Sequence, residues 1–313
     1  MIYNTEQAMV NFNMKLLILQ AILFIFTSTC FADTNSWHFL PSDVSQLHSK
    51  DADARIQYGT DPLQFGDLRL PKKSGNHPVA IVIHGGCWVS KFADLKNSAA
   101  LSDALRDEGI ATWNIEYRRI DNPGGGWPGS FQDIAAAVDI LPSIAKKYSL
   151  DLSHVIVIGQ SAGGHFALWV AARHNLPVSS ILYKKNPITV KGVISLGGVP
   201  DLFAFREQAK KVCEIDAIGK LIGEGSIKNY SKNFKEASPS ELLPLGTKQV
   251  LIYGEDEVTV PAQYGYDYKK IASSKGDDVS VITVKYAAHH EYNVPNAVTW
   301  PVILDNAKAL LYK

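Results

Sequence analysis

The sequence is poor in cysteine, and it has no excess of charge of either sign. Its 313 residues include three cysteines, and 31 basic residues balance 31 acidic ones, so the formal net charge is zero. Three cysteines are too few for a disulfide-built scaffold. A neutral chain also lacks the electrostatic footprint that nucleic acid or an anionic membrane surface requires. These absences favour a small neutral or apolar substrate over a polyanion.

Patterns that bind metal ions or phosphates are missing as well. No group of Cys and His residues has metal-ligand spacing, and no glycine-rich phosphate loop occurs. We therefore expect neither a metal nor an organic cofactor. Internal repeats, low-complexity stretches and linkers are absent too, while 46% of the residues are apolar. This composition supports one globular domain with a sizeable core.

An apolar run, residues 16–26, follows Lys15 near the N-terminus. Small residues come after it, up to Ala32, and this layout predicts a secretory signal peptide that is cleaved near Ala32. The run is too short to cross a bilayer comfortably. Met14 directly precedes the basic residue, which suggests that translation starts there and that residues 1–13 are not translated.

The expected mature chain, residues 33–313, is a single domain that is secreted or periplasmic. The alternatives are a membrane anchor and a lipoprotein modified at Cys30. Only Cys87 and Cys213 remain after the signal peptide. Export would permit a disulfide between them, but Cys87 lies in a loop that is expected to take part in the active site. The sequence therefore favours two free thiols and leaves a disulfide as the alternative.

Strand-like and helix-like segments alternate along the chain, which predicts an α/β fold with a mostly parallel central sheet and helices on both faces. Residues 55–70 are expected to form a β-hairpin before the first parallel strand. The expected strands are residues 79–83, 111–117, 155–158, 192–196, 249–253 and 280–286, and the expected helices are residues 99–108, 130–148, 162–173, 261–273 and 300–311.

Residues 201–246 interrupt this alternation, because they contain no strand-like run and are rich in polar residues. In such an architecture they would lie over the carboxyl ends of the strands, where ligands bind. We interpret them as a small cap over the active site. A surface insertion with no part in catalysis is the alternative.

The strongest local signal is the pentapeptide Gly159-Gln160-Ser161-Ala162-Gly163. It stands between an expected strand and an expected helix, which is the context of the G-x-S-x-G nucleophile elbow. There a strained turn exposes the serine hydroxyl, and the glycines leave room for the neighbouring strand and helix. Ser161 is therefore the predicted nucleophile, and Gln160 is expected in the substrate pocket.

The segment His84-Gly85-Gly86-Cys87-Trp88 directly follows another expected strand. Glycines allow backbone N–H groups to approach a substrate closely. The N–H of Gly86 or Cys87, together with that of Ala162, is expected to hold the oxyanion of a tetrahedral intermediate.

Two larger side chains flank this loop. His84 stands where the loop leaves the strand, so we expect it to anchor the loop rather than to act as a base. Trp88 is assigned to the substrate pocket, with simple packing as the alternative.

A base and an acid follow the last two expected strands. His289 and His290 can supply a base, since the histidine pKa suits proton transfer in both directions at neutral pH. In an extended chain neighbours point to opposite sides, so only one of the two can face the nucleophile. Asp256 or Glu257 can orient that histidine. The order Ser, acid, His along the chain is the α/β-hydrolase order.

Together these segments resemble the esterase branch of the α/β-hydrolase superfamily that carries an HGG-plus-Trp oxyanion loop. That branch includes hormone-sensitive-lipase-like esterases, arylformamidases and feruloyl-esterase-like proteins. The resemblance covers residues 55–313 and implies the α/β-hydrolase fold, a serine carboxylesterase, and no metal or cofactor. The further matching pieces are Glu116-Tyr117-Arg118-Arg119, Gly126-Trp127-Pro128 with Asp133, Gly164-His165, and His289 with Pro295.

The resemblance also chooses between the neighbouring candidates. In the family the base stands six residues before a proline, so Pro295 selects His289. The acid stands three residues after the glycine that ends its strand, and counting from Gly254 gives Glu257. Asp256 fits by residue type and remains the alternative acid.

These features imply a serine hydrolase that cleaves small carboxylic esters through an acyl-enzyme, with short acyl chains preferred because the expected cap is polar. An arylformamidase-like amidase or a peptidase-like acyl hydrolase would use the same triad and is the first alternative. A non-catalytic binding protein on the same scaffold is the second. The sequence leaves the oligomeric state and the natural substrate open.

Overall fold

The computed structural model describes residues 38–223 and 227–312, except for the side chains of residues 227–230. The predicted signal peptide and Cys30 lie outside the described residues. The described residues form one compact unit. Within the described chain, none of the helices combines the length and the apolar character that a membrane crossing requires.

A mixed sheet of eight strands runs through this unit in the order β1-β2-β4-β3-β5-β6-β7-β8. The pairs β1–β2 and β2–β4 are antiparallel, and all the other pairs are parallel. This arrangement confirms the α/β-hydrolase fold. The strands are β1 (Ala54–Gln57), β2 (Phe65–Arg69), β3 (His77–Ile83), β4 (Ala111–Ile115), β5 (Leu150–Gln160), β6 (Gly192–Leu196), β7 (Lys248–Gly254) and β8 (Val279–Val284).

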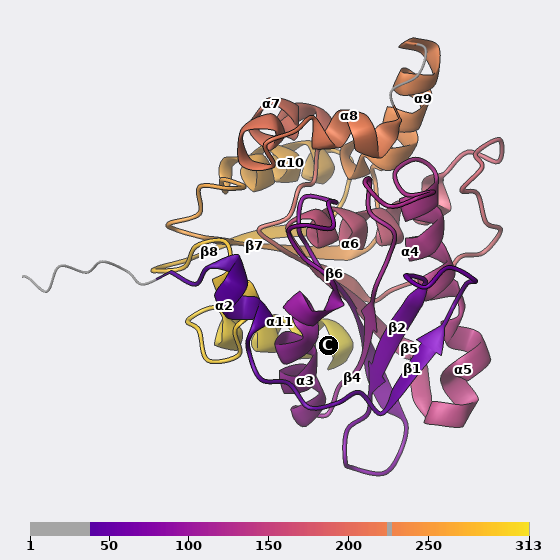
Figure 1. The fold of residues 1–313 in the computed structure, drawn as a ribbon, viewed down its shortest axis with the longest axis vertical. Helices are drawn as coiled ribbons and strands as arrows, with labels where there is room; N and C mark the ends of the chain where they lie inside the picture. The colour runs from indigo at the N-terminus through magenta and orange to yellow at the C-terminus, as the bar shows by residue number, and fades with distance from the viewer. Residues whose placement is uncertain (1–37, 224–226, 313) are drawn as a thin grey trace, which may run out of the picture. The chain divides into compact units, whose positions relative to one another are not determined.

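Helices cover both faces of the sheet (Figure 1). Helices α3 and α11 pack on one face and enclose the smaller core, while α4, α6, α7, α8 and α10 contribute to the larger core on the other. The helices are α2 (Pro41–Ser45), α3 (Ala99–Asp107), α4 (Gly129–Asp139), α5 (Leu141–Tyr148), α6 (Ala162–Ala172), α7 (Leu202–Val212), α8 (Ala217–Ile222), α9 (Ile227–Ala237), α10 (Gln263–Ser274) and α11 (Trp300–Tyr312).

The two cores follow from the alternation of side chains along the strands. In β3, Val79, Ile81 and Ile83 face the larger core, whereas Ala80 and Val82 face the smaller one. Because both faces are covered, each strand is a nearly continuous apolar run rather than an alternating one.

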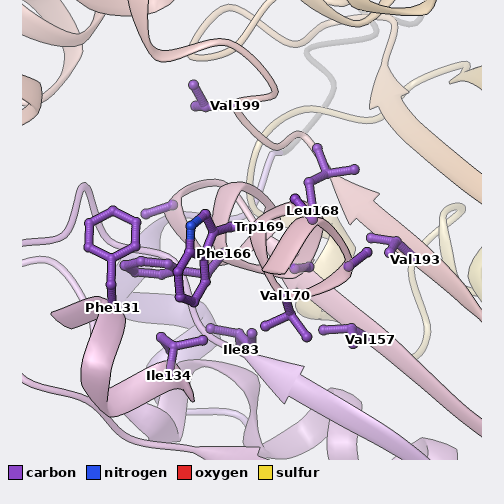
Figure 2. Packing of buried hydrophobic residues seen from close by; sticks show 14 of the residues in the cluster. Ile83, Phe131, Ile134, Val157, Phe166, Leu168, Trp169, Val170, Val193 and Val199 are labelled. Atoms are coloured by element: carbon purple, nitrogen blue, oxygen red, sulfur yellow. The ribbon is translucent and has the colours of Figure 1, made fainter. Parts of the chain in front are cut away.

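Helix α6 lies at the centre of the larger core, and all eleven of its residues are buried. A helix that is apolar all round is stable only when it is surrounded. Figure 2 shows Phe166 and Trp169 of this helix beside Phe131 of α4, with Val157 of β5 and Val193 of β6 near the helix. This packing fixes the N-terminal end of α6, which directly follows Ser161.

The expected and the observed helices differ in number. The single helix expected over residues 130–148 is two helices, α4 and α5, with Pro142 in the first turn of α5. Proline has no backbone N–H to continue an α-helix, which accounts for the division. Helix α2 has no counterpart among the expected helices, and neither have α7, α8 and α9.

The interruption at residues 201–246 contains helices α7, α8 and α9 and a 3₁₀ turn, Pro239–Leu242, and no strand occurs among its described residues. Figure 1 shows these helices stacked on one side of the sheet, beyond α6.

Candidate active site

Ser161 occupies a sharp turn between β5 and α6. Its backbone has φ +54° and ψ −119°, a conformation that L-residues rarely adopt and that is often found at functional sites. The turn requires glycine on both sides. A Cβ at Gly159 would lie 2.0 Å from the Gly163 carbonyl oxygen, and a Cβ at Gly163 would lie 2.0 Å from that of Ile83. The G-x-S-x-G pattern is therefore a steric requirement of this connection.

A cavity of about 170 Å³ opens at this turn. It brings together Ser161 with its neighbour Gln160, both candidate histidines, and the loop at Gly86 and Cys87. Pro41 of α2 and Val212 of α7 also belong to its wall, as do the remaining lining residues, Phe92, Ala93, Asn97 and Thr259.

His289 is bound to a buried carboxylate. Its Nδ1 lies 2.7 Å from Oε2 of Glu257, and both side chains are largely inaccessible to solvent. The other carboxylate oxygen accepts hydrogen bonds from the backbone N–H groups of Thr259 and Val260, at 2.7 and 3.0 Å. Gln160 holds the histidine from the other side, since its Nε2 donates to the His289 carbonyl oxygen at 3.0 Å.

Opposing effects set the charge of Glu257. Burial by itself raises the pKa of this carboxyl, but the attraction of His289 and the hydrogen bonds from His289, Val260 and Thr259 outweigh it. The net result is a pKa below the usual glutamate value, so Glu257 stays ionised at neutral pH. An ionised carboxylate at Nδ1 fixes the orientation of the imidazole and stabilises its cation.

Asp256, the alternative acid, points elsewhere. Its side chain is 42% exposed, and its Oδ2 lies 3.5 Å from Nε2 of His38. The two acids stand in a turn that follows β7, and that turn directs only Glu257 inward. Of the two candidates, the structure therefore brings Glu257 to His289.

His290 also lines the cavity, contrary to the expectation that one of the two histidines points away. The expectation assumed extended backbone. The backbone of His290 is helical instead, with φ −104° and ψ −14°, because a 3₁₀ turn, Glu291–Asn293, begins there. The two rings lie edge to face, with centroids 5.3 Å apart.

The loop after β3 presents free backbone donors to the cavity. Gly86, Cys87 and Trp88 all have positive φ, at 96°, 53° and 57°. Two consecutive non-glycine residues in this region indicate a strained loop that its surroundings hold in place. In the described chain the N–H groups of Gly86, Cys87 and Ala162 make no backbone hydrogen bond outside the helices and strands. Gly86 and Cys87 line the cavity, whereas Ala162, which directly follows Ser161, is 1% exposed and is not among the lining residues.

Glu116 holds both ends of this loop. Its carboxylate lies 3.1 Å from Nε2 of His84 at the start of the loop and accepts from the N–H of Leu95 at the end, at 3.0 Å. Arg119 donates to the same carboxylate at 2.7 Å. Although burial raises the pKa of Glu116, His84, Arg119 and the Leu95 N–H together lower it to about 2. His84 is fully buried and anchors the loop, in agreement with the expectation.

Two expectations about this loop are wrong. Trp88 does not line the cavity; it is 1% exposed and packs in the larger core, with its ring edge-on to His165. Cys87 and Cys213 form a disulfide rather than two free thiols. The bond joins the loop to the end of α7, across 126 positions in sequence. Cys87 lines the cavity, and so does Val212, the neighbour of the buried Cys213.

Sequence reasoning missed several residues of the cavity wall. Pro41, Asn97 and Thr259 come from elements that carry no catalytic motif, and no pattern in the sequence singles them out. Among the described side chains, no group of three or more His, Cys, Asp or Glu residues is placed to hold a metal ion.

The chain is also similar to known proteins. The BD-FAE family model matches residues 67–271. An isoprenylcysteine alpha-carbonyl methylesterase of Arabidopsis thaliana is 23% identical over 83% of this chain and 62% of its own length. A kynurenine formamidase of Meyerozyma guilliermondii is 32% identical over 47% of this chain and 52% of its own length. The chain thus spans about half to three-fifths of the length of these curated relatives.

Solved structures share the fold. Esterase B from Lactobacillus rhamnosis superposes with a TM-score of 0.71 at 20% identity, over 94% of this chain and 96% of that one. A truncated carbohydrate esterase from gut microbiota gives a TM-score of 0.70 at 20% identity, over 85% of this chain and 98% of that one. At these identities the likeness establishes the architecture.

Removing the disulfide should destabilise the protein. A cross-link that closes a loop of this length restricts the unfolded chain by about 4–5 kcal/mol in the chain-entropy description. We expect Cys213→Ala to lower the free energy of unfolding by an amount of that order in denaturant titrations. Reductant should shift the wild type to the same midpoint and leave the variant unchanged. A wild-type midpoint that is insensitive to reductant under unfolding conditions would contradict the bond.

Proposed function

Because the chain belongs to the BD-FAE family of α/β-hydrolases, we propose that it hydrolyses carboxylic esters with Ser161 as the nucleophile. One observation carries the proposal. The hydroxyl-bearing turn at Ser161 opens into the same cavity as His289, whose Nδ1 is held at 2.7 Å by the buried carboxylate of Glu257. The relatives named as methylesterases, and the fold shared with solved esterases, support ester hydrolysis.

The proposed reaction follows the serine-hydrolase scheme. His289 removes the proton from the Ser161 hydroxyl as its oxygen attacks the ester carbonyl carbon. The resulting oxyanion accepts hydrogen bonds from the N–H groups of Gly86, Cys87 and Ala162. When the C–O bond to the alcohol breaks, His289 returns the proton to the leaving oxygen. Water, activated by the same histidine, then hydrolyses the acyl-enzyme and restores the serine.

Glu257 contributes to this scheme by orienting the imidazole. It keeps Nδ1 protonated, so that Nε2 is the basic nitrogen, and it stabilises the imidazolium that forms during proton transfer. The lowered pKa of Glu257 means that its negative charge persists at moderately acidic pH.

The second candidate function is hydrolysis of a formamide or a related amide. The similarity to a kynurenine formamidase favours it, since that relative is the more identical of the two curated proteins compared above. Both reactions pass through the same acyl-enzyme chemistry, and only the leaving group differs.

Replacing the nucleophile tests the proposal directly. Ser161→Ala should lower kcat by about 10⁴ to 10⁶, which is typical of the loss of a serine nucleophile. A fluorophosphonate probe should label the wild type and leave Ser161→Ala unlabelled. Ser153→Ala removes an exposed serine on β5 and serves as the matched control, with wild-type activity and labelling expected. Equal labelling of Ser161→Ala and the wild type would refute the assignment.

The acid can be identified by paired isosteric substitutions. Glu257→Gln keeps the shape of the side chain but loses the charge that orients His289, so kcat should fall by up to about 10⁴. Asp256→Asn changes an exposed side chain that does not contact His289, and its kcat should stay close to that of the wild type. A large loss in Asp256→Asn with a nearly active Glu257→Gln would reverse the roles of the two acids.

Short acyl chains should be the better substrates. The cavity of about 170 Å³ is small beside the pockets of 300–1,000 Å³ that hold drug-sized ligands. We expect kcat/KM for p-nitrophenyl esters to fall as the acyl chain lengthens from acetate and butyrate to decanoate. N-formylkynurenine in the same panel distinguishes the second candidate function. Faster cleavage of the long-chain esters would contradict the size argument.

We also propose that the protein is exported. The signal-peptide layout of residues 15–32 supports export, as does the disulfide, because structural disulfides persist in oxidising compartments. Sequencing of the mature N-terminus should find a start near Asp33. An intact segment 16–26 in the purified protein would contradict cleavage.

A further inference from the structure

Tyr292 stands three residues after the proposed base, in the 3₁₀ turn Glu291–Asn293. Its side chain is fully buried, and its ring lies edge to face with that of His289, with centroids 6.3 Å apart. Tyr292 has no role in the reaction proposed above. Because a buried hydroxyl needs hydrogen-bond partners, the identity of those partners indicates what this one does.

The hydroxyl of Tyr292 has two partners. The backbone N–H of Gly254, the last residue of β7, donates to the tyrosine oxygen at 2.7 Å, and Oε2 of Glu257 lies 3.2 Å from the same oxygen. An N–H group can only donate, and a tyrosine hydroxyl carries one proton, so that proton is directed at the carboxylate. Burial, followed by the charge of Glu257, raises the pKa of Tyr292 well above the ordinary tyrosine value. The hydroxyl therefore keeps its proton at neutral pH.

Oε2 of Glu257 is also the oxygen that holds the imidazole. Nδ1 of His289 lies 2.7 Å from it, so tyrosine and histidine donate to one carboxylate oxygen. The N–H groups of Thr259 and Val260 donate to the other oxygen. Bonds to that oxygen alone leave the carboxylate able to rotate about one end. Among the described side chains, Tyr292 is the one besides His289 that donates to Oε2, and its bond removes this freedom.

The end of β6 leaves room for this pair of side chains. Gly197, directly after β6, has φ +50°, and a Cβ there would lie 2.7 Å from Cε2 of Tyr292 and 3.0 Å from Oε2 of Glu257. A larger residue at this position would displace the tyrosine or the carboxylate. Glycine lets both groups stay in contact with each other.

We propose that Tyr292 is a positioning residue of the triad, whose hydroxyl fixes Oε2 of Glu257 against Nδ1 of His289. This inference rests on the proposed ester hydrolysis, because Tyr292 acts through the orientation of the base. A hydrogen bond to a charged acceptor is stronger than one between neutral groups, so its loss should be measurable. The alternative is that Tyr292 only packs and caps the end of β7.

Tyr292→Phe keeps the ring and removes the hydroxyl. With p-nitrophenyl acetate, kcat should fall by about tenfold, as the loss of a hydrogen bond to a charged group would cause. KM should stay within about twofold of the wild-type value, because Tyr292 does not line the cavity and the lost bond supports the transition state. Expressing kcat per site titrated to completion with a fluorophosphonate excludes misfolded protein from the comparison.

Tyr268→Phe is the matched control. Tyr268 is a buried tyrosine whose hydroxyl donates to Oε1 of Gln249 at 2.7 Å, near the opposite end of β7. Each variant loses one buried hydroxyl, so both should lower the midpoint of urea unfolding, whereas only Tyr292→Phe should lower kcat. Wild-type kcat in Tyr292→Phe, or the same loss of kcat in Tyr268→Phe, would overturn the positioning role.

A double-mutant cycle separates positioning from a general loss of structure. If Tyr292 acts through Glu257, its replacement by Phe should lower kcat by about tenfold in the wild type and hardly at all in Glu257→Gln, where the charged acceptor is gone. Equal fold-losses in the two backgrounds would assign Tyr292 to the fold alone.

The positioning role and the proposed function fail in different ways. Wild-type turnover without a kcat loss in Tyr292→Phe, or without coupling to Glu257, overturns the positioning role and leaves ester hydrolysis standing. Absence of turnover for every ester, together with absence of fluorophosphonate labelling, overturns the proposed function and the positioning role with it.

Discussion

The strained turn at Ser161 is the constraint on which the rest of the site depends. An L-residue at φ +54° is unfavourable by itself, so the turn persists only because β5 on one side and α6 on the other cannot move. The glycines at 159 and 163 allow carbonyl oxygens to approach where a Cβ would collide at 2.0 Å. Burial of every residue of α6 provides the matching rigidity. The position of the serine hydroxyl is thus determined by core packing several residues away.

Three buried carboxylates hold the surrounding loops in place through hydrogen bonds. Glu116 ties together the two ends of the loop that bears Gly86, and Glu257 holds the imidazole of His289. Glu291 accepts hydrogen bonds from the N–H groups of Ala288 and Phe39, and it contacts Nδ1 of His38 at 2.9 Å. In this way it links the histidine loop to the segment that brings Pro41 into the cavity wall. Each carboxylate joins segments that are far apart in sequence. Because hydrogen bonds are directional, they orient these segments more specifically than a hydrophobic contact could.

The disulfide adds a covalent link to this arrangement. Cys87 follows Gly86 in the strained loop, and Cys213 ends α7, so the bond connects the free N–H donors of the loop to the helices over the sheet. Val212, next to Cys213, reaches the cavity itself. Cys87 and Val212 therefore shape the pocket, and the disulfide limits how far α7 can move from the loop.

Several features of the protein could be read directly from the sequence. The alternation of apolar runs and helical periods gave the sheet and most helices, because strands buried on both faces and helices packed on them leave strong local patterns. The motif around Ser161 and the choice of Glu257 over Asp256 rest on fixed spacing to glycines, and the structure brings those residues to one cavity and to His289, respectively.

Tertiary structure decided the remainder. The break between α4 and α5 was visible as Pro142, but helical periodicity continued across it. The entry of His290 into the cavity wall goes with its helical backbone, which alternation rules for extended chain do not supply. Pairing of the cysteines, and the meeting of Pro41, Asn97 and Val212 at one cavity, depend on contacts between distant segments. Sequence determined the local chemistry and its order along the chain, whereas only the folded chain determined which side chains share the cavity, because that depends on the paths of separate loops over a common sheet edge.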